Sequence, residues 1–451
     1  MASSRRSRPA DRGLPPVEAA AQAALAAHAG QRLGVALSGG RDSAALLVAC
    51  AALAPVHGVT LHAVHVHHGL SVHAEAWAGA CAALAARQGV AIDVRRVAVD
   101  AVAALGVEAA ARQARYAALR DAAVTLRLDG VLLAHHEDDQ AETVLLQALR
   151  GAGPHGLAAM AACQRDGEGC TWLRPLLEVP RASIDAYVAA RRISYVDDDS
   201  NATSAQRRNA LRHDVMPALA TAFPYASRTL ARVAAHQAEA ASLLDDLAAQ
   251  DARAAYDGAT LACIALAALS APRARNVLRW FLRRHGLPPP STARLAAMLA
   301  QLAAPRRDAE VHLAHAGIAL GVHRGRIHVH ASAPPPYAVR WQGEPELRLS
   351  HGRLAFVDAV GTGLSADAAA KAPIVVRSRA GGERLGLDPS RPRRALKAWL
   401  RESGLPPWQR TALPLVFCGD VLAAVPGLGV DPAFRAGPGI RGYRLDWLPD
   451  A

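Results

Sequence analysis

Short apolar runs and amphipathic stretches alternate over the first third of the chain. Four apolar runs predict strands, at residues 33–37, 61–66, 92–99 and 131–134. A helical pattern follows each of them, at residues 42–53, 74–88, 108–126 and 138–150. Apolar strands separated by helices of this length predict a parallel sheet with helices on both faces. Ligands of such sheets bind at the carboxyl ends of the strands, so we expect the chemistry there.

The remainder of the chain divides into further domains by its pattern. Residues 212–330 are helical at first, and three consecutive prolines at 334–336 indicate a linker. Short strand-like runs then surround a basic helix, at residues 374–376, 415–417 and 421–425. We expect an α/β catalytic domain, a mostly helical middle domain and a small α+β C-terminal domain. The expected boundaries are 1–31 (N-terminal extension), 32–215 (first domain), 216–330 (middle domain), 331–372 (linker) and 373–451 (C-terminal domain).

Composition narrows the choice of partner and compartment. A net charge of +12 and a pI near 10.1 favour a polyanionic partner, and nucleic acid fits better than a membrane. The six cysteines are scattered without a C-x-x-C pair, which argues against an iron–sulfur cluster, a zinc ribbon or a disulfide framework. The N-terminus carries a basic arm, Arg5 to Arg12, and the helix expected at 17–29 is too short to span a bilayer. We therefore expect a soluble, cytoplasmic protein.

The first strand runs into the turn Ser38-Gly39-Gly40-Arg41-Asp42-Ser43. Glycines at a strand-to-helix turn let backbone N–H groups and the helix N-terminus approach a phosphate. The turn is not a Walker A loop, because it lacks the G-x-x-x-x-G-K-[ST] pattern. It resembles instead the pyrophosphate loop of the N-type ATP pyrophosphatases (the PP-loop superfamily). That resemblance implies an adenine-nucleotide alpha-hydrolase-like fold, and cleavage of ATP between the α and β phosphates.

Further motifs follow along the chain in a fixed order. They lie at residues 65–71, 108–116, 134–143, 149–157, 174–177, 198–201 and 208–212, and then at 377–384, 396–400 and 405–410. The series resembles the tRNA(Ile)-lysidine synthetase family. The match is dense over residues 32–223, loose in the middle segment and clear again at the C-terminus.

The resemblance implies a specific ligation. ATP adenylates the C2 oxygen of the wobble cytidine in the CAU anticodon of tRNA(Ile), and free L-lysine then displaces AMP to form lysidine. The product changes codon specificity from AUG to AUA and aminoacylation from methionine to isoleucine. The resemblance also implies Mg²⁺, held by Asp42, because a carboxylate beside phosphates needs a cation. The class further suggests a homodimer.

Roles for individual residues follow from the same resemblance. Asp42, Asp139 and Glu142 are the candidate catalytic residues, and Asp138, Asp139 and Glu142 the candidate lysine-binding residues. Asp139 and Glu142 share one face of a helix near its N-terminus, where carboxylates are favoured, although first-turn acids are also ordinary caps. The candidate nucleotide-binding residues are Ser38, Gly39, Gly40, Arg41, Asp42, Ser43, His67, Arg112, Arg115 and His135. The candidate tRNA-binding residues are Arg208, Arg212, Arg393, Arg394 and Lys397.

Some motif residues have ordinary structural interpretations. We expect His65 to be packed, and we prefer a binding role over zinc for His135 and His136, because no cysteine stands at ligand spacing. The basic stretch 273–284 contains Trp280 and Phe281, which suits RNA but is more typical of a core at helical spacing.

Three alternatives share parts of this pattern. A tRNA thiolation enzyme has the same loop but generally uses cysteines for sulfur transfer. A small-molecule amidotransferase needs an ammonia source, and no glutaminase-like nucleophile motif is visible. A non-catalytic tRNA-binding protein would not need the intact loop and the acidic helix start.

Overall fold

The computed structural model describes residues 13–69, 71–98, 107–196, 207–303 and 311–450. The motif at 198–201 and the basic arm from Arg5 to Arg12 lie outside the described residues. The chain folds into two compact units, residues 1–244 and 245–451, and each is described by itself. Within the described residues, no helix combines the length and the apolarity needed to cross a membrane.

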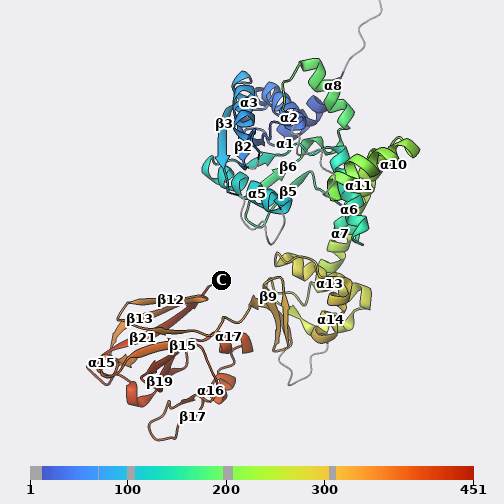
Figure 1. The fold of residues 1–451 in the computed structure, drawn as a ribbon. Helices are drawn as coiled ribbons and strands as arrows, with labels where there is room; N and C mark the ends of the chain where they lie inside the picture. Colours follow the sequence, from blue (N-terminus) through green and yellow to red (C-terminus); the bar gives the residue numbers. More distant parts are fainter. Residues whose placement is uncertain (1–12, 70, 99–106, 197–206, 304–310, 451) are drawn as a thin grey trace, which may run out of the picture. The chain divides into compact units, whose positions relative to one another are not determined.

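The first unit is built on a six-stranded sheet of order β3-β2-β1-β4-β6-β5 (Figure 1). Its parallel strands are β1 (Arg32–Ala36), β2 (Thr60–His67), β3 (Ala91–Arg96), β4 (Gly130–Leu132) and β6 (Thr171–Leu173). β5 (Cys163–Arg165) is antiparallel to β6 at the edge. The four strands predicted from apolar runs correspond to β1–β4, which confirms the α/β interpretation.

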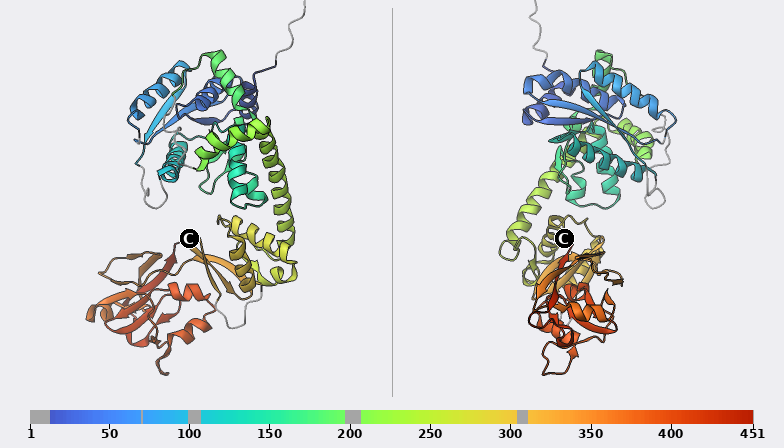
Figure 2. Two further views of the ribbon diagram at one scale, coloured as in Figure 1. Left: turned by 45° about the vertical axis from the view of Figure 1, so that its right-hand side comes forward. Right: turned by 90° about the vertical axis from the view of Figure 1, so that its left-hand side faces the viewer.

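Helices cover both faces of this sheet. Successive residues of a strand point to opposite faces, so two neighbouring apolar residues pack against different helices. Leu132 packs with α1 (Pro16–Ala27), α2 (Arg41–Leu53), α3 (Ala74–Arg87) and α8 (Arg181–Arg191). Its neighbour Val131 packs with α5 (Val107–Thr125) on the other face. Figure 2 shows the ribbon of this unit from two further directions. The remaining helices of this unit are α6 (Glu137–Leu149), α7 (Pro154–Leu157), α9 (Arg207–Ala210) and α10 (Met216–Ala222). Long α11 (Ala226–Ala252) begins in this unit.

The second unit begins with helices packed on a small sheet. The helices are α12 (Cys263–Ala268), α13 (Ala271–Arg284) and α14 (Thr292–Leu302). The sheet contains β7 (Leu261–Ala262), β10 (Arg326–Ala331), β9 (Ile318–His323) and β8 (His312–His315), in that order. Phe281 is fully buried, as its helical spacing suggested, and Arg273 and Arg283 of the same helix pair with Asp251 and Asp245. The basic stretch 273–284 is therefore largely structural.

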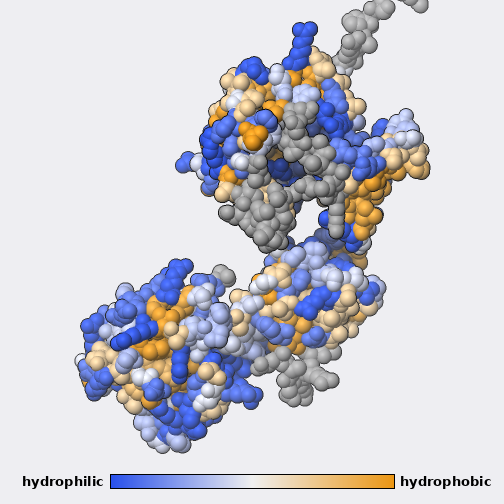
Figure 3. All heavy atoms as spheres, in the orientation of Figure 1, coloured by the Kyte–Doolittle hydropathy of each residue, from blue (hydrophilic) through white to orange (hydrophobic). Residues whose placement is uncertain are grey.

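Two further antiparallel sheets form the end of the chain. One contains β11 (Ala338–Arg340), β15 (Ile374–Arg377), β18 (Leu415–Cys418), β19 (Val421–Val425) and β20 (Gly429–Val430). The other contains β12 (Glu346–Leu349), β13 (Gly352–Val360), β21 (Arg441–Pro449) and β14 (Leu364–Ser365). One apolar cluster joins the two sheets. Hydrophilic residues cover much of the visible face here (Figure 3).

Residues 331–372, expected to be a linker, are folded. They contribute β11–β14 and α15 (Ala366–Lys371), and β13 pairs with β21 along its whole length. The alternation of exposed and buried residues in Glu346–Leu349 is the period of a half-buried strand. The remaining elements of this part are α16 (Leu396–Glu402), α17 (Pro407–Ala412) and the hairpin of β16 (Arg384–Leu385) and β17 (Arg394–Ala395).

Candidate active site

The turn between β1 and α2 is shaped to receive a phosphate. Gly39 has φ +91°, and a Cβ there would lie 3.1 Å from Cys81 Sγ, so this position requires glycine. Ser43 Oγ donates to the Gly40 carbonyl at 2.9 Å and lies 3.0 Å from Ser38 Oγ. No side chain caps α2, so its first N–H groups stay available to an anion.

Arg41, placed with the nucleotide-binding loop by the sequence, directs its side chain elsewhere. Its Nη1 lies 2.7 Å from Asp185 Oδ1 on α8, and its Nε lies 3.4 Å from Asp42 Oδ1. The guanidinium therefore ties the loop to α8, and what Arg41 offers a phosphate is its backbone.

His136 stands between the loop and the acidic helix. It is buried, and its Nδ1 accepts a hydrogen bond from Asp138 N at 3.3 Å, which places the ring proton of the neutral form on Nε2. That Nε2 lies 3.7 Å from Asp42 Oδ2 and 3.5 Å from Asp139 Oδ2. A single imidazole thus connects the carboxylate of the phosphate loop with the first acid of the α6 face.

The two acids on that face are already paired with two arginines. Arg208 Nε donates to Glu142 Oε2 at 2.9 Å, and Arg212 Nε donates to Glu142 Oε1 at 2.7 Å. Both guanidiniums also reach Asp139 Oδ1, at 3.2 and 2.9 Å. The side chains of Glu142 and Asp139 are only 3% and 12% exposed, so the group forms a nearly closed, electroneutral quartet.

The surroundings favour the charged forms of Asp139 and Arg212. Burial alone would raise the pKa of Asp139, but His136, Arg208, His135 and Arg212 outweigh it and lower the pKa below its usual value. Burial likewise opposes the charge on Arg212, yet hydrogen bonding to Glu142 raises the pKa of its guanidinium. Residues 211–215 form a short π-helical segment, a conformation frequent at functional sites.

Asp138, the third candidate lysine ligand, has other partners. Its Oδ1 accepts from Ser227 Oγ at 2.7 Å, and its Oδ2 accepts from the Arg181 N–H at 3.3 Å. These bonds connect the start of α6 with α11 and α8. The structure therefore brings Asp139 and Glu142 together and gives Asp138 a separate set of contacts.

A cluster of arginines lies beside the quartet around Tyr116. Arg112 Nη2 donates to Tyr116 Oη at 3.3 Å, and the guanidiniums of Arg112 and Arg115 lie 5.0 and 5.7 Å from its ring centre. Burial lowers the pKa of Arg115, and among the described residues neither arginine pairs with a carboxylate. Arg174 is buried, donates to the Ala161 carbonyl and leaves its Nε without a partner.

The positive charges of these arginines act on His135. Burial, reinforced by Arg174, Arg208 and Arg112 against the opposing charge of Asp139, lowers its pKa to about 3. It is therefore neutral at pH 7, and its buried Nδ1 has no hydrogen-bond partner. On β2, His65 is packed as expected, with Nδ1 2.8 Å from the Leu37 carbonyl oxygen. His67 Nε2 instead lies 3.3 Å from Glu75 Oε1.

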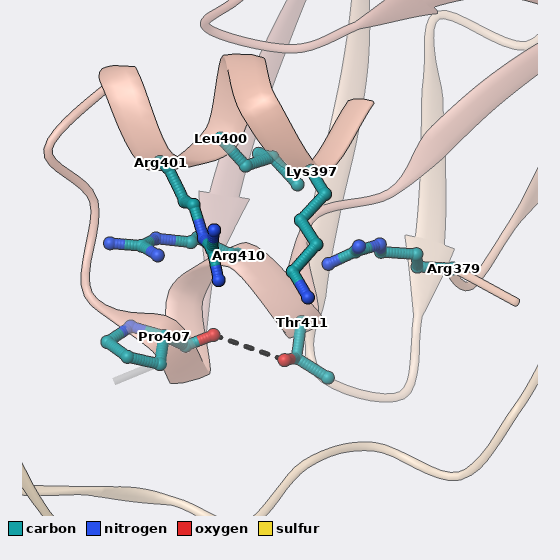
Figure 4. Close-up of a pocket in the computed structure, with 7 residues that line it drawn as sticks. All are labelled: Arg379, Lys397, Leu400, Arg401, Pro407, Arg410 and Thr411. Atoms are coloured by element: carbon teal, nitrogen blue, oxygen red, sulfur yellow. Dashed lines mark hydrogen bonds between the residues drawn. The ribbon is translucent and has the colours of Figure 1, made fainter. Parts of the chain in front are cut away.

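The candidate tRNA-binding residues occupy two different places. Arg208 and Arg212 belong to the quartet. Arg393 pairs with the buried carboxylate of Asp431 at 2.9 Å, and Arg394 pairs with Glu402 and stacks over Trp399. Lys397, in contrast, lines a pocket of the C-terminal part (Figure 4).

Sequence reasoning gave His136 only a general binding role, and it gave Arg174 no role of its own. The signal for His136 is the sequence His-x-x-Asp at 136–139, which resembles a capping box: the Asp139 side chain accepts from the His136 N–H at 3.1 Å. The signal for Arg174 is a charged residue directly after an apolar strand, where the ligand edge of the sheet lies.

The parallel sheet, the glycine turn and the acidic helix start define a PP-loop ATP pyrophosphatase. The family model described as the PP-loop domain matches residues 15–219. Models described as the TilS substrate binding domain and the TilS substrate C-terminal domain match residues 261–328 and 374–447. The chain belongs to the tRNA(Ile)-lysidine synthase family.

Curated relatives match over nearly the whole chain. The tRNA(Ile)-lysidine synthase of Ralstonia nicotianae is 42% identical over 432 residues, 92% of each chain. That of Azoarcus sp. is 40% identical over 422 residues, 93% of this chain and 92% of its own. Among solved structures, the U34-tRNA thiolase NcsA from Methanococcus maripaludis matches over 49% of this chain and 78% of its own, at 16% identity and a TM-score of 0.42. Family membership decides against the thiolation, amidotransferase and non-catalytic alternatives.

Proposed function

We propose that this enzyme ligates free L-lysine to C2 of the wobble cytidine in the CAU anticodon of tRNA(Ile), using ATP. The observation that carries this proposal is the position of His136, whose Nε2 lies within 3.7 Å of carboxylates from both motifs. The phosphate loop and the acidic face are therefore neighbours. A site that adenylates a base and then delivers an amine to the same carbon needs this arrangement.

In the first step, the C2 oxygen of the cytidine attacks the α-phosphate, and pyrophosphate leaves. The N-terminus of α2 and the loop hydroxyls receive the departing phosphates. Asp42, one third exposed at the loop, is the residue that would hold Mg²⁺, which commonly binds through one or two carboxylates and substrate phosphates. Bound there, Mg²⁺ would neutralise charge that develops on the phosphates. Arg112 and Arg115 would donate hydrogen bonds to further phosphate oxygens.

In the second step, the ε-amine of lysine attacks C2, the C2–O bond breaks, and AMP leaves with that oxygen. The ammonium form of lysine must first lose a proton, and we assign the role of accepting it to the carboxylates Asp139 and Glu142. Both acids are paired with Arg208 and Arg212. A lysine that binds to Asp139 or Glu142 therefore replaces one of these arginines as the partner of the acid. Its cation takes the place of a guanidinium, and the released arginine becomes free to hold the lysine carboxylate or a tRNA phosphate.

One assay tests the whole reaction. Purified enzyme, ATP, Mg²⁺ and labelled lysine are incubated with a tRNA(Ile) transcript carrying a CAU anticodon. We expect stoichiometric label in that tRNA, and none in a transcript with uridine in place of the wobble cytidine. Binding of ATP and tRNA without incorporation of lysine would refute the proposal.

The two half-reactions separate the roles of the acids. Asp139→Asn is expected to reduce lysidine formation far more than lysine-independent pyrophosphate release, because the proposed role of Asp139 begins with lysine. An equal loss in both measurements would contradict this division.

A further inference from the structure

His65, the buried histidine of β2, takes no part in the proposed reaction, yet it touches the start of the phosphate loop. It is 4% exposed, and its Nδ1 lies 2.8 Å from the carbonyl oxygen of Leu37, the residue before Ser38. A carbonyl oxygen can only accept, so Nδ1 carries the ring proton and donates it. His65 therefore holds the backbone at the point where β1 passes into the loop.

The surroundings keep this imidazole neutral and in place. Burial lowers the pKa of His65, and the nearby His67 lowers it further, against the hydrogen bond to Leu37, which raises it. Cys81 of α3 packs beside the ring, with Sγ 3.4 Å from Nδ1 and 3.8 Å from the Leu37 carbonyl oxygen. Burial raises the pKa of this thiol to about 11, so it also stays neutral and adds at most a weak S–H donor.

The hydrogen bond from His65 determines the direction of the next backbone N–H. A trans peptide is planar, and its C=O and N–H groups point in opposite directions. Because the Leu37 carbonyl is held toward His65, the N–H of Ser38 in the same peptide points away from His65. A side chain on β2 thus fixes the first peptide of the loop.

Two further carbonyls of the loop are held by donors as well. The Gly39 carbonyl accepts from the Val196 N–H at 2.9 Å, and the Gly40 carbonyl accepts from Ser43 Oγ at 2.9 Å. Phosphate oxygens are attracted by N–H groups and repelled by carbonyl oxygens. Because these carbonyls are already engaged, they do not turn toward a phosphate that enters the loop.

Packing alone does not hold the loop in this conformation. A pocket of about 130 Å³ adjoins Gly39, and Cys81, Leu84 and Val196 also line it. The loop has room to shift on that side, so its conformation depends on the hydrogen bonds to its carbonyls. Val196 donates from its backbone and Ser43 belongs to the loop. His65 is therefore the donor that a substitution can remove without changing the loop itself.

We propose that His65 is a positioning residue for ATP: its Nδ1–H keeps the Leu37 carbonyl turned away from the phosphates and so orients the loop that receives them. The inference deepens the proposed function, because it rests on ATP binding at this loop. Without the hydrogen bond the Leu37 carbonyl is unsatisfied, and its peptide rotates until the oxygen reaches water. ATP must then reverse that rotation in order to bind, so the loss affects the nucleotide and not lysine.

The test compares three variants of the full-length enzyme with the wild type. His65→Leu removes the donor, and His65→Asn keeps an N–H donor at the same number of bonds from Cα. His62→Leu is the control, because His62 lies on the same strand and faces the opposite side of the sheet. Calorimetry measures the affinity for α,β-methylene-ATP, which cannot release pyrophosphate. Lysidine formation gives KM for ATP and KM for lysine.

The expected losses are specific to the nucleotide. His65→Leu is expected to bind the analogue about 10- to 100-fold more weakly and to raise KM for ATP by a similar factor, with KM for lysine changed less than about 2-fold. His65→Asn is expected to bind within about 3-fold of the wild type, and His62→Leu within about 2-fold. Thermal unfolding shows that each variant is folded. Should His65→Leu fail to fold, His65→Gln replaces it, because its amide lies one bond farther from Cα and misses the Leu37 oxygen.

Wild-type affinity for the analogue in folded His65→Leu, or in folded His65→Gln, would overturn the inference. Equal losses in His65→Leu and His65→Asn would overturn it too, as would equal rises in KM for ATP and for lysine, since a purely structural role predicts both. The proposed function fails separately, if the wild-type enzyme binds the analogue and incorporates no lysine.

Discussion

Replacing Glu142 with glutamine tests the quartet most directly, because the change keeps the shape of the side chain and removes its charge. Glu142 is 3% exposed and accepts three guanidinium N–H bonds, at 2.7, 2.9 and 3.0 Å. In Glu142→Gln, Asp139 is the one carboxylate among the described residues that still pairs with Arg208 and Arg212. Two partly buried cations then share one carboxylate.

The expected cost follows from burial. Breaking a buried ion pair by removing one partner costs about 3 to 5 kcal/mol. The two arginines are 25% and 29% exposed and can recover part of their hydration, so we expect a loss of about 1 to 3 kcal/mol. For a unit of this size, that loss corresponds to a decrease in Tm of roughly 3 to 10 °C.

The assay is a double-mutant cycle followed by calorimetry of the full chain. Glu142→Gln, Arg212→Gln and the double variant are compared with the wild type, and the double variant is expected to lose about 1 to 3 kcal/mol less than the sum of the two singles. Arg191→Gln serves as an additive control, because Arg191 of α8 pairs with Glu18 of α1 and, among the described residues, not with an acid of the quartet. If the Glu142 and Arg212 losses add to within about 0.5 kcal/mol, the two side chains do not stabilise each other and the partner-exchange mechanism fails.

Three further predictions concern other parts of the molecule. Asp42→Asn is expected to reduce AMP formation by at least about 100-fold at saturating tRNA, since charge on the departing phosphates loses its stabilisation, and radiolabelled ATP measures this. The pKa of His135 is lowered to about 3 while an unfolded histidine titrates near 6.5, so only the unfolded state takes up this proton as the pH falls below 6.5. Stability should therefore decrease on acidification by up to about 1.4 kcal/mol per pH unit, and His135→Asn should flatten urea-derived stability between pH 6.5 and 5; parallel curves would contradict this. Gly321→Ala should destabilise the second unit by about 1 to 3 kcal/mol through contact with the Trp408 ring, and Trp408→Leu should relieve most of that loss in the same calorimetric scan.

The sheet of the first unit could be predicted because its pattern is local. Strand residues such as Val131 and Leu132 are apolar on both sides, since helices cover both faces, and this produces the short continuous runs read from the sequence. The strands of 346–360 were missed for the opposite reason. Their apolar residues, such as Leu347 and Leu349, alternate with charged ones in a region that the prolines made resemble a linker.

The pairing inside the site could not be predicted from the sequence. Arg208 and Arg212 have the spacing of a solvated helix face, and Glu142 lies 66 and 70 residues before them. Only the path of the chain decides that both arginines face α6 rather than solvent. The same limit applies to Arg41, whose partner Asp185 lies on a helix with no motif of its own.

His136 shows where physical reasoning from the sequence could have gone further. Histidine is not a common N-cap, so the position before α6 carried no signal in a search for Ser, Thr, Asp or Asn. Yet a histidine that accepts a hydrogen bond with Nδ1 carries the ring proton of its neutral form on Nε2, which can then approach a second acceptor. At the carboxyl end of β4, beside strand β1 and its loop, Nε2 lies 3.5 Å from Asp139 of the same helix and 3.7 Å from Asp42. The cap and the link between the two half-sites are therefore one feature: the hydrogen bond that begins α6 also orients the group that joins Asp139 to the ATP loop.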